Sequence, residues 1–72
     1  MLQICTPQEL ADNIRTAAQR RNVTIADMLR TLQIGHNLIT KITNGAYPRL
    51  DTIAKIAAFL ECSIDVLIYR QE

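Results

Sequence analysis

The sequence predicts an all-α fold, a compact bundle of five short helices. Apolar residues recur at spacings of three and four, and no segment alternates apolar and polar residues for long enough to form a strand. The first three apolar stretches are each followed by a stop signal that contains Asn, Gln, Gly or Pro. A chain of 72 residues has room for one domain, which we assign to residues 1–72.

The composition excludes several classes of protein. Hydrophobic residues make up 49% of the chain and charged residues 21%, with two glycines and two prolines, which argues against a disordered chain or a linker. No run approaches the roughly 18 apolar residues of a membrane span. The first ten residues lack the basic start and apolar core of a signal peptide. We therefore expect a cytoplasmic protein.

The first predicted helix begins at Pro7 and ends near residues 20–22. Thr6 can cap this helix, Pro7 suits the first helical position, and Glu9 lies near the positive end of the helix dipole. Apolar residues then follow at helical spacing, at Leu10, Ile14, Ala17 and Ala18.

Two short helices are predicted in the middle of the chain. Thr24 followed by Asp27 resembles a capping box and predicts the start of the second helix. The apolar positions of that helix are Ala26, Met28, Leu29 and Leu32. After a break at residues 33–35, a third helix is predicted from about His36 to Asn44, and Gly45 suits the left-handed residue just past its end.

Two more helices complete the predicted bundle. Pro48 places a loop before the fourth helix, which covers residues 50–60. The inner stripe of that helix is Ile53, Ile56, Ala57 and Leu60. Ser63 is expected to cap the last helix, residues 64–70, with Arg70 near its negative end.

The third helix is predicted to have one polar and one apolar side. At about 100° per residue, its polar side carries His36, Asn37, Thr40, Lys41 and Asn44, with no acidic residue. Its other side carries Leu38, Ile39 and Ile42, which would anchor it. Such a polar face is often only solvated. A short turn between two helices, the second of which reads bases with its outer face, is also the helix-turn-helix arrangement.

The charge distribution says more than the net charge of +1. The 23 residues between Asp27 and Asp51 contain no carboxylate. They carry the basic or titratable residues Arg30, His36, Lys41 and Arg49. This segment predicts a one-sided positive field on a nearly neutral protein.

Other chemistry is not expected. Cys5 and Cys62 lie far apart without a CxxC motif, and the single His36 does not complete a zinc set, so we expect two reduced thiols, with Cys62 buried. The glycines lack the spacing and the GK[ST] of a phosphate loop. No catalytic triad or carboxylate pair has a meaningful spacing, so no enzyme activity, metal or cofactor is predicted.

Residues 23–68 resemble the Cro/C1-type (Xre-type) helix-turn-helix family without a gap. The motifs that carry the resemblance are "NG" at 44–45, Pro48, "LDTIAKIA" at 50–57 and "SIDVL" at 63–67. The resemblance implies a lambda-repressor-like fold with the helix-turn-helix unit at residues 24–45. Among family members, the chain looks most like small regulators of Gram-positive bacteria and phages.

The resemblance also implies residue roles. The base-reading positions are His36, Asn37, Thr40 and Lys41, in agreement with the polar side of the third helix. The implied contacts to DNA phosphates are Thr24, Asn44, Tyr47 and Arg49.

Five positions depart from the family pattern. Gly35 replaces the Ser or Thr that usually caps the third helix, a loss of only a few tenths of a kcal/mol. Ile25 replaces a Gln that usually touches phosphate, and it is expected to pack instead. Gln33 replaces the usual turn glycine, and a positive φ there would cost on the order of 1 kcal/mol. Ala18 and Thr43 replace an Arg and a Glu that often pair, so both charges are absent together.

The function that follows is a DNA-binding transcriptional regulator, with repression expected. Since one helix reads only a few base pairs, a homodimer on double-stranded operator DNA is expected. Val66, Ile68 and Tyr69 are candidates for the dimer contact, and core packing is an equal alternative for Ile68. The low net charge and Ile25 leave open a protein-interaction module of the antitoxin or antirepressor type.

Overall fold

Five helices in the predicted order make up the fold. A computed structural model describes residues 3–69 of the chain. The helices are α1 (Pro7–Arg20), α2 (Ile25–Thr31), α3 (Leu38–Thr43), α4 (Leu50–Phe59) and α5 (Ile64–Ile68). The predicted all-α fold class is therefore confirmed.

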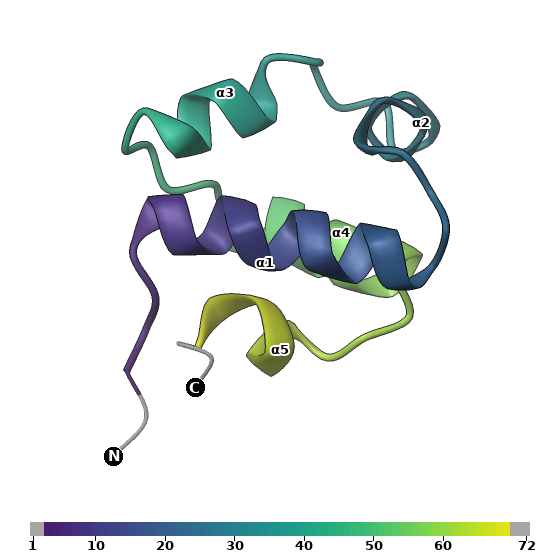
Figure 1. Ribbon diagram of the computed structural model, residues 1–72. Helices are drawn as coiled ribbons and strands as arrows, with labels where there is room; N and C mark the ends of the chain where they lie inside the picture. The colour runs from purple at the N-terminus through teal and green to yellow at the C-terminus, as the bar shows by residue number, and fades with distance from the viewer. Residues whose placement is uncertain (1–2, 70–72) are drawn as a thin grey trace.

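Helix α1 is the centre of the arrangement (Figure 1). Helices α2 and α3 lie on one side of α1, above it in the figure, and α5 lies on the opposite side. Helix α4 runs behind α1. Helix α1 contacts both α3 and α5, and α4 contacts α5, within a molecule of 35 × 24 × 19 Å. Helix α5 therefore does not cover the side of the molecule that carries α3.

A single apolar core joins all five helices. Its largest fully buried side chains are Leu10, Ile14, Met28, Ile42, Ile56, Leu60 and Leu67. Each such side chain contributes about 1.5 to 3 kcal/mol by leaving water. No polar or charged residue among those described is buried. The core positions predicted in the first and fourth helices are all buried, whereas Ala26 of the second is exposed, so that prediction was wrong.

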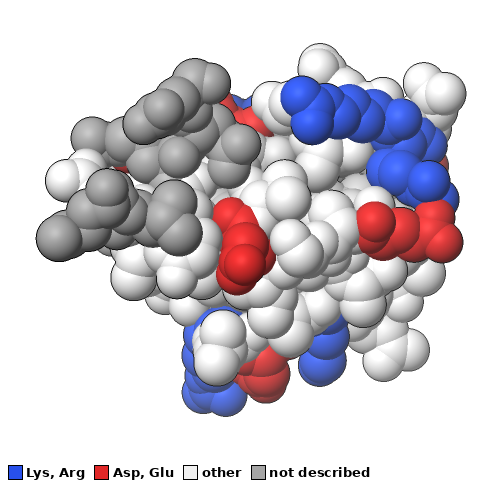
Figure 2. Space-filling view, turned by 90° about the horizontal axis from the view of Figure 1, so that it is seen from below, with Lys and Arg blue, Asp and Glu red and all other residues white. Residues whose placement is uncertain are grey.

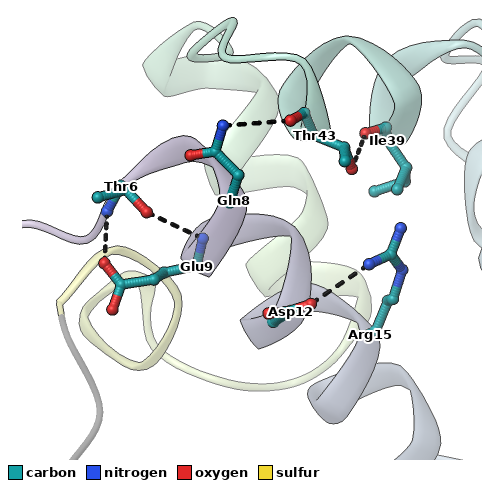
Figure 3. Close-up of polar contacts among 7 residues, drawn as sticks. All are labelled: Thr6, Gln8, Glu9, Asp12, Arg15, Ile39 and Thr43. Carbon is teal, nitrogen blue, oxygen red and sulfur yellow. Dashed lines mark hydrogen bonds and ion pairs between the residues drawn. The ribbon is translucent and has the colours of Figure 1, made fainter.

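The two predicted N-terminal caps differ in completeness. The Thr6 hydroxyl accepts from the Glu9 backbone N–H (3.2 Å), and the Glu9 carboxylate accepts from the Thr6 N–H (2.9 Å), a complete capping box (Figure 3). The Thr24 hydroxyl likewise accepts from the Asp27 N–H (3.0 Å). The Asp27 carboxylate pairs with Arg30. The Asp side chain is shorter than that of Glu, and no bond from the Asp27 carboxylate back to the Thr24 N–H accompanies the capping bond. Helix α2 therefore has one half of the predicted capping box.

Helix α3 is shorter than predicted. It begins at Leu38, and His36 and Asn37 precede its first turn. A tight turn, in which the Leu38 N–H donates to the Gly35 carbonyl (3.1 Å), occupies the expected start. Asn37 is the N-cap, yet its side chain makes no capping hydrogen bond. The expectation that Gly35 stands at the cap position was therefore wrong by two residues.

Helix α5 also ends early. Tyr69 is extended and forms an isolated antiparallel bridge with Ile4, so the helix stops at Ile68. Ser63 occupies the N-cap position, but its hydroxyl makes no capping hydrogen bond, contrary to prediction. The predicted role of Arg70 lies outside the described residues.

The prediction that Cys62 is buried was wrong. Both cysteines are free thiols, but Cys5 is buried while Cys62 is half-buried. Burial of Cys5 follows from the pairing of its segment with the end of α5, where the Cys5 N–H donates to the Ile68 carbonyl (2.8 Å). Burial raises the pKa of the Cys62 thiol.

Helices α1 to α4 end with the same turn. The residue after each C-cap has a positive φ, at Asn22 (57°), Gln33 (57°), Gly45 (105°) and Glu61 (54°). The next N–H donates back to a carbonyl five residues earlier, as the Ile34 N–H does to Leu29 (2.9 Å). Glycine is the residue best suited to this conformation, and only one of the four positions has it. The prediction for Gly45 is confirmed, and Gln33 adopts the anticipated strained φ.

We expect Gln33→Gly to stabilise the domain by about 1 kcal/mol, since it removes the cost of a left-handed non-glycine residue. Urea denaturation measures this free energy. The matched control is Gln19→Gly, which places glycine at a helical position of α1 and should destabilise. A loss of stability in both variants would contradict the strain argument.

Candidate nucleic-acid interface

The two sides of α3 differ in burial as the sequence predicts. Ile39 and Ile42 are buried against the core and Leu38 is half-buried. The opposite side and the turn before it expose all of the predicted reading residues: His36, Asn37, Thr40 and Lys41. All four side chains are therefore accessible to solvent, two in the turn before α3 and two on the helix itself. Their role toward DNA remains a prediction.

The C-terminal turn of α3 is attached to α1 by a hydrogen bond (Figure 3). The Gln8 side-chain amide donates to the Thr43 carbonyl (3.2 Å), and the Thr43 hydroxyl donates to the Ile39 carbonyl (2.8 Å). Thr43 stands where related sequences carry an acid, and its expected partner position, Ala18, is buried. The contact of Thr43 with α1 is thus uncharged, and it involves Gln8 instead of position 18. No sequence signal marks Gln8, because an exposed glutamine in a first helical turn is common.

Helix α2 presents Thr24 and buries most of Ile25. The Thr24 hydroxyl oxygen accepts the capping bond, which leaves its own proton available to a further acceptor. Ile25 is half-buried and packs against the core, as expected.

The loop after α3 contains three of the predicted phosphate contacts. Asn44 and Arg49 are exposed. The Tyr47 hydroxyl instead donates to the Cys5 carbonyl (2.9 Å) and lies 3.5 Å from the Cys5 sulfur. Partial burial, together with the hydrogen bond to Cys5, raises the pKa of Tyr47 to about 12. Tyr47 therefore attaches this loop to the N-terminal segment, a contact that the sequence analysis missed.

The positive charge of this region is concentrated on two residues. Arg30 is paired with Asp27, as Arg21 is with Glu61, so neither adds a free cation. Lys41 and Arg49 form no ion pair with any described residue. The opposite, α5-side face of the molecule mixes acidic and basic side chains (Figure 2). Because Arg30 is paired, it adds less to a positive field near α3 than the sequence alone suggests.

Comparison with known families identifies the domain. The sequence profile of the Cro/C1-type HTH DNA-binding domain matches residues 13–72, most of the chain. The chain belongs to the Cro/C1-type helix-turn-helix DNA-binding family. Comparisons with curated proteins and with solved structures give no match.

The family match starts within α1 of this Cro/C1-type domain. Three residues with contacts to the rest of the fold precede the matched range. Cys5 contacts the loop after α3, Thr6 caps α1, and Gln8 contacts α3. The N-terminal segment of this chain thus supports elements that the family shares.

Residues 3–69 contain no group of three or more His, Cys, Asp and Glu side chains that could hold a metal ion. None of the helices in this range is both long and apolar enough to cross a membrane.

The raised pKa of Tyr47, caused first by burial and then by its hydrogen bond with Cys5, predicts an alkaline sensitivity of this Cro/C1-type domain. Because the folded pKa is raised above the ordinary value of 10, the stabilising contribution of Tyr47 is fully present below pH 10 and is lost as the pH rises toward 12. The Tyr47→Phe variant lacks the titrating hydroxyl and its hydrogen bond. It should therefore be less stable than wild type below pH 10, and the two free energies of unfolding should converge as the pH rises toward 12. Urea denaturation from pH 8 to 12 measures it, with Tyr69→Phe as the matched control. A constant difference between wild type and Tyr47→Phe would contradict the assignment.

Proposed function

We propose that this Cro/C1-type domain is a sequence-specific transcriptional repressor that reads the major groove of DNA with α3. The observation that carries the proposal is the exposed, acid-free side of α3, which an apolar opposite side holds against the core. Groups that donate hydrogen bonds to base edges are concentrated there, and no carboxylate is present to repel phosphates.

The residue types fit base recognition. An Asn amide can pair with adenine through two hydrogen bonds, and a Lys ammonium can donate to the guanine acceptors. Asn37 stands at the N-terminus of α3, the part of a recognition helix that reaches furthest into the groove. Its amide makes no capping bond, so forming a base contact costs the helix no cap. His36 and Thr40 extend the same surface.

The backbone contacts are assigned to the segments that flank α3. Thr24, Asn44 and Arg49 are exposed with groups that can donate to phosphate oxygens. Tyr47 is a weaker candidate than the family resemblance implies, because its only hydroxyl proton already binds the Cys5 carbonyl. We assign Tyr47 mainly to positioning Arg49, two residues further along the loop.

The proposed active form is a homodimer on an operator with two half-sites about one helical turn apart. Val66 and Tyr69 are proposed contacts, whereas Ile68 packs against the core and is assigned to the fold. Repression would follow when the bound dimer blocks polymerase in the cytoplasm. Selection of bound DNA from a random pool tests this function, and a palindromic motif is the expected result.

The second candidate function is a protein-interaction module. The net charge of +1 and the small number of unpaired cations near α3 favour it, since both limit attraction to DNA. Ile25 no longer supports it, because that side chain packs against the core. No enriched motif in the selection, combined with a tight protein partner in a pull-down, would favour this module over the repressor.

We expect Asn37→Ala and Lys41→Ala each to cost about 1 to 3 kcal/mol of binding free energy at one base position, and to relax specificity there. Fluorescence anisotropy with operators varied at single positions measures both effects. Lys55→Ala is the matched control, because Lys55 is the chain's other lysine and lies exposed on α4. Unchanged binding after both α3 substitutions would refute the assigned reading surface.

Arg49→Gln should behave differently. We expect weaker binding to all sequences alike and a salt slope shallower by about 0.9, the value for one lost phosphate contact. Titrations at several salt concentrations measure the slope. The control is Arg21→Gln, in which the lost charge is one already paired with Glu61. A change in base preference with Arg49→Gln would contradict a phosphate role.

A further inference from the structure

The last carbonyl of α3 is bound by a side chain from a different helix. The Gln8 side-chain amide, in the first turn of α1, donates to the Thr43 carbonyl (3.2 Å) (Figure 3). The carbonyls in the last turn of a helix have no partner inside the helix. In α3 these belong to residues 40–43, and the backbone N–H groups of residues 44–46 satisfy all of them except that of Thr43. Gln8 completes the set.

This bond is an addition to the turn after α3 and is not part of it. Helices α1, α2 and α4 end with the same kind of turn as α3, and their last carbonyls belong to Arg20, Thr31 and Phe59. Of these four helices, α3 alone receives a side-chain bond from another helix at its last carbonyl within residues 3–69. The turn therefore closes without such a bond elsewhere, and in α3 it has one more support.

The first turn of α1 holds Gln8 in a fixed position. Thr6 and Glu9 form the complete capping box that begins this helix, and Pro7 occupies its first position. Because Gln8 lies between Pro7 and Glu9, the capping bonds limit fraying of the turn that carries it. In Figure 3 the Gln8 side chain extends away from this box and reaches Thr43. The donor is therefore presented from a rigid element.

Helix α3 needs such a support because few contacts hold it. Its buried residues are Ile39 and Ile42, which fix the side that faces the core. A helix of six residues frays at its ends unless other contacts hold them. The proposed reading residues Thr40 and Lys41 lie in its last turn. Their direction therefore depends on whether that turn stays closed.

A second bond from the N-terminal segment holds the other end of the same turn. The Tyr47 hydroxyl donates to the Cys5 carbonyl (2.9 Å). Residues 43 and 47 are thus both attached to residues 5–8, which precede the range that the family profile matches, residues 13–72. Of the two bonds, that of Gln8 acts directly on α3.

We propose that Gln8 is a positioning residue for DNA recognition. By closing the last turn of α3 through the Thr43 carbonyl, Gln8 fixes the direction of Thr40 and Lys41 toward the bases. This role rests on the proposed function, because that function assigns both side chains to base reading. Gln8 contributes to specificity through α3 and needs no DNA contact of its own.

Amide hydrogen exchange of the full chain without DNA tests whether Gln8 closes the turn. Gln8→Met keeps the length and neutrality of the side chain and removes its donor. Because the bond is exposed to water, we expect the amide protons of residues 44–46 to exchange about 2- to 5-fold faster. Exchange at residues 32–34, the equivalent turn after α2, should not change. A general loss of stability would instead accelerate both turns.

Two further variants separate the hydrogen bond from other effects. Gln8→Lys restores a donor that can reach the Thr43 carbonyl, so exchange at residues 44–46 should return to the wild-type rate. Gln19→Met is the matched control, since Gln19 is exposed near the other end of α1. If Gln8→Met does not fold by circular dichroism, Gln8→Ala takes its place. Unchanged exchange without the donor, equal acceleration of both turns, or no rescue by Gln8→Lys would overturn the proposal.

DNA binding tests the effect on recognition. The readout is the ratio of dissociation constants between a selected operator and the same operator altered at the base pair that Lys41→Ala identifies. We expect Gln8→Met to reduce this ratio about 2- to 5-fold, part of the effect of losing one base contact, and Gln19→Met to leave it unchanged. An unchanged ratio in Gln8→Met would overturn the positioning role alone. A wild-type domain without base preference would contradict the proposed function, and hydrogen exchange would then decide only whether Gln8 closes the turn.

Discussion

Packing of α3 against α1 is the interaction on which the exposed polar surface depends. A helix of six residues is not stable by itself in water, because its few hydrogen bonds do not offset the cost of nucleation. Ile39 and Ile42 provide the missing stability by burial in the core that α1 helps to form. Their burial commits one side of α3 to the fold and leaves the other free. The polar residues of α3 are presented outward because the apolar ones are required inward.

The helices of this small domain are connected with little spare chain. Four of them end in the same tight turn, with a left-handed residue and a backward hydrogen bond. Such turns satisfy the last carbonyls of each helix and redirect the chain within two or three residues. The cost is strain at Asn22, Gln33 and Glu61, which lack the freedom of glycine. In a domain with a single small core, these turns do much to set the relative positions of the helices.

The segments at the two ends of the described range, residues 3–69, strengthen the same arrangement. The N-terminal segment lies against the end of α5 through the contacts of Ile4 and Cys5, and Tyr47 attaches the loop after α3 to it. Two elements far apart in sequence are thereby linked to the segment that follows α3. A change at this end of the molecule therefore acts on that loop through a short chain of hydrogen bonds, at a distance from the exposed side of α3.

The sequence by itself determined the helices, the core and the exposed side of α3, because these follow from local periodicity and capping chemistry. Leu10, Ile14, Ile53 and Ile56 are buried as their spacing predicts, and the family resemblance is confirmed. Only the tertiary structure decided what depends on distant contacts. The bridge between Ile4 and Tyr69 shortened α5, and the burial of Cys5 and the bond of Tyr47 join residues more than forty positions apart. The start of α3 depended on a turn bond at Gly35, which periodicity does not encode. Local patterns record which face of a helix is apolar, whereas the partner that a side chain meets is set by how the whole chain packs.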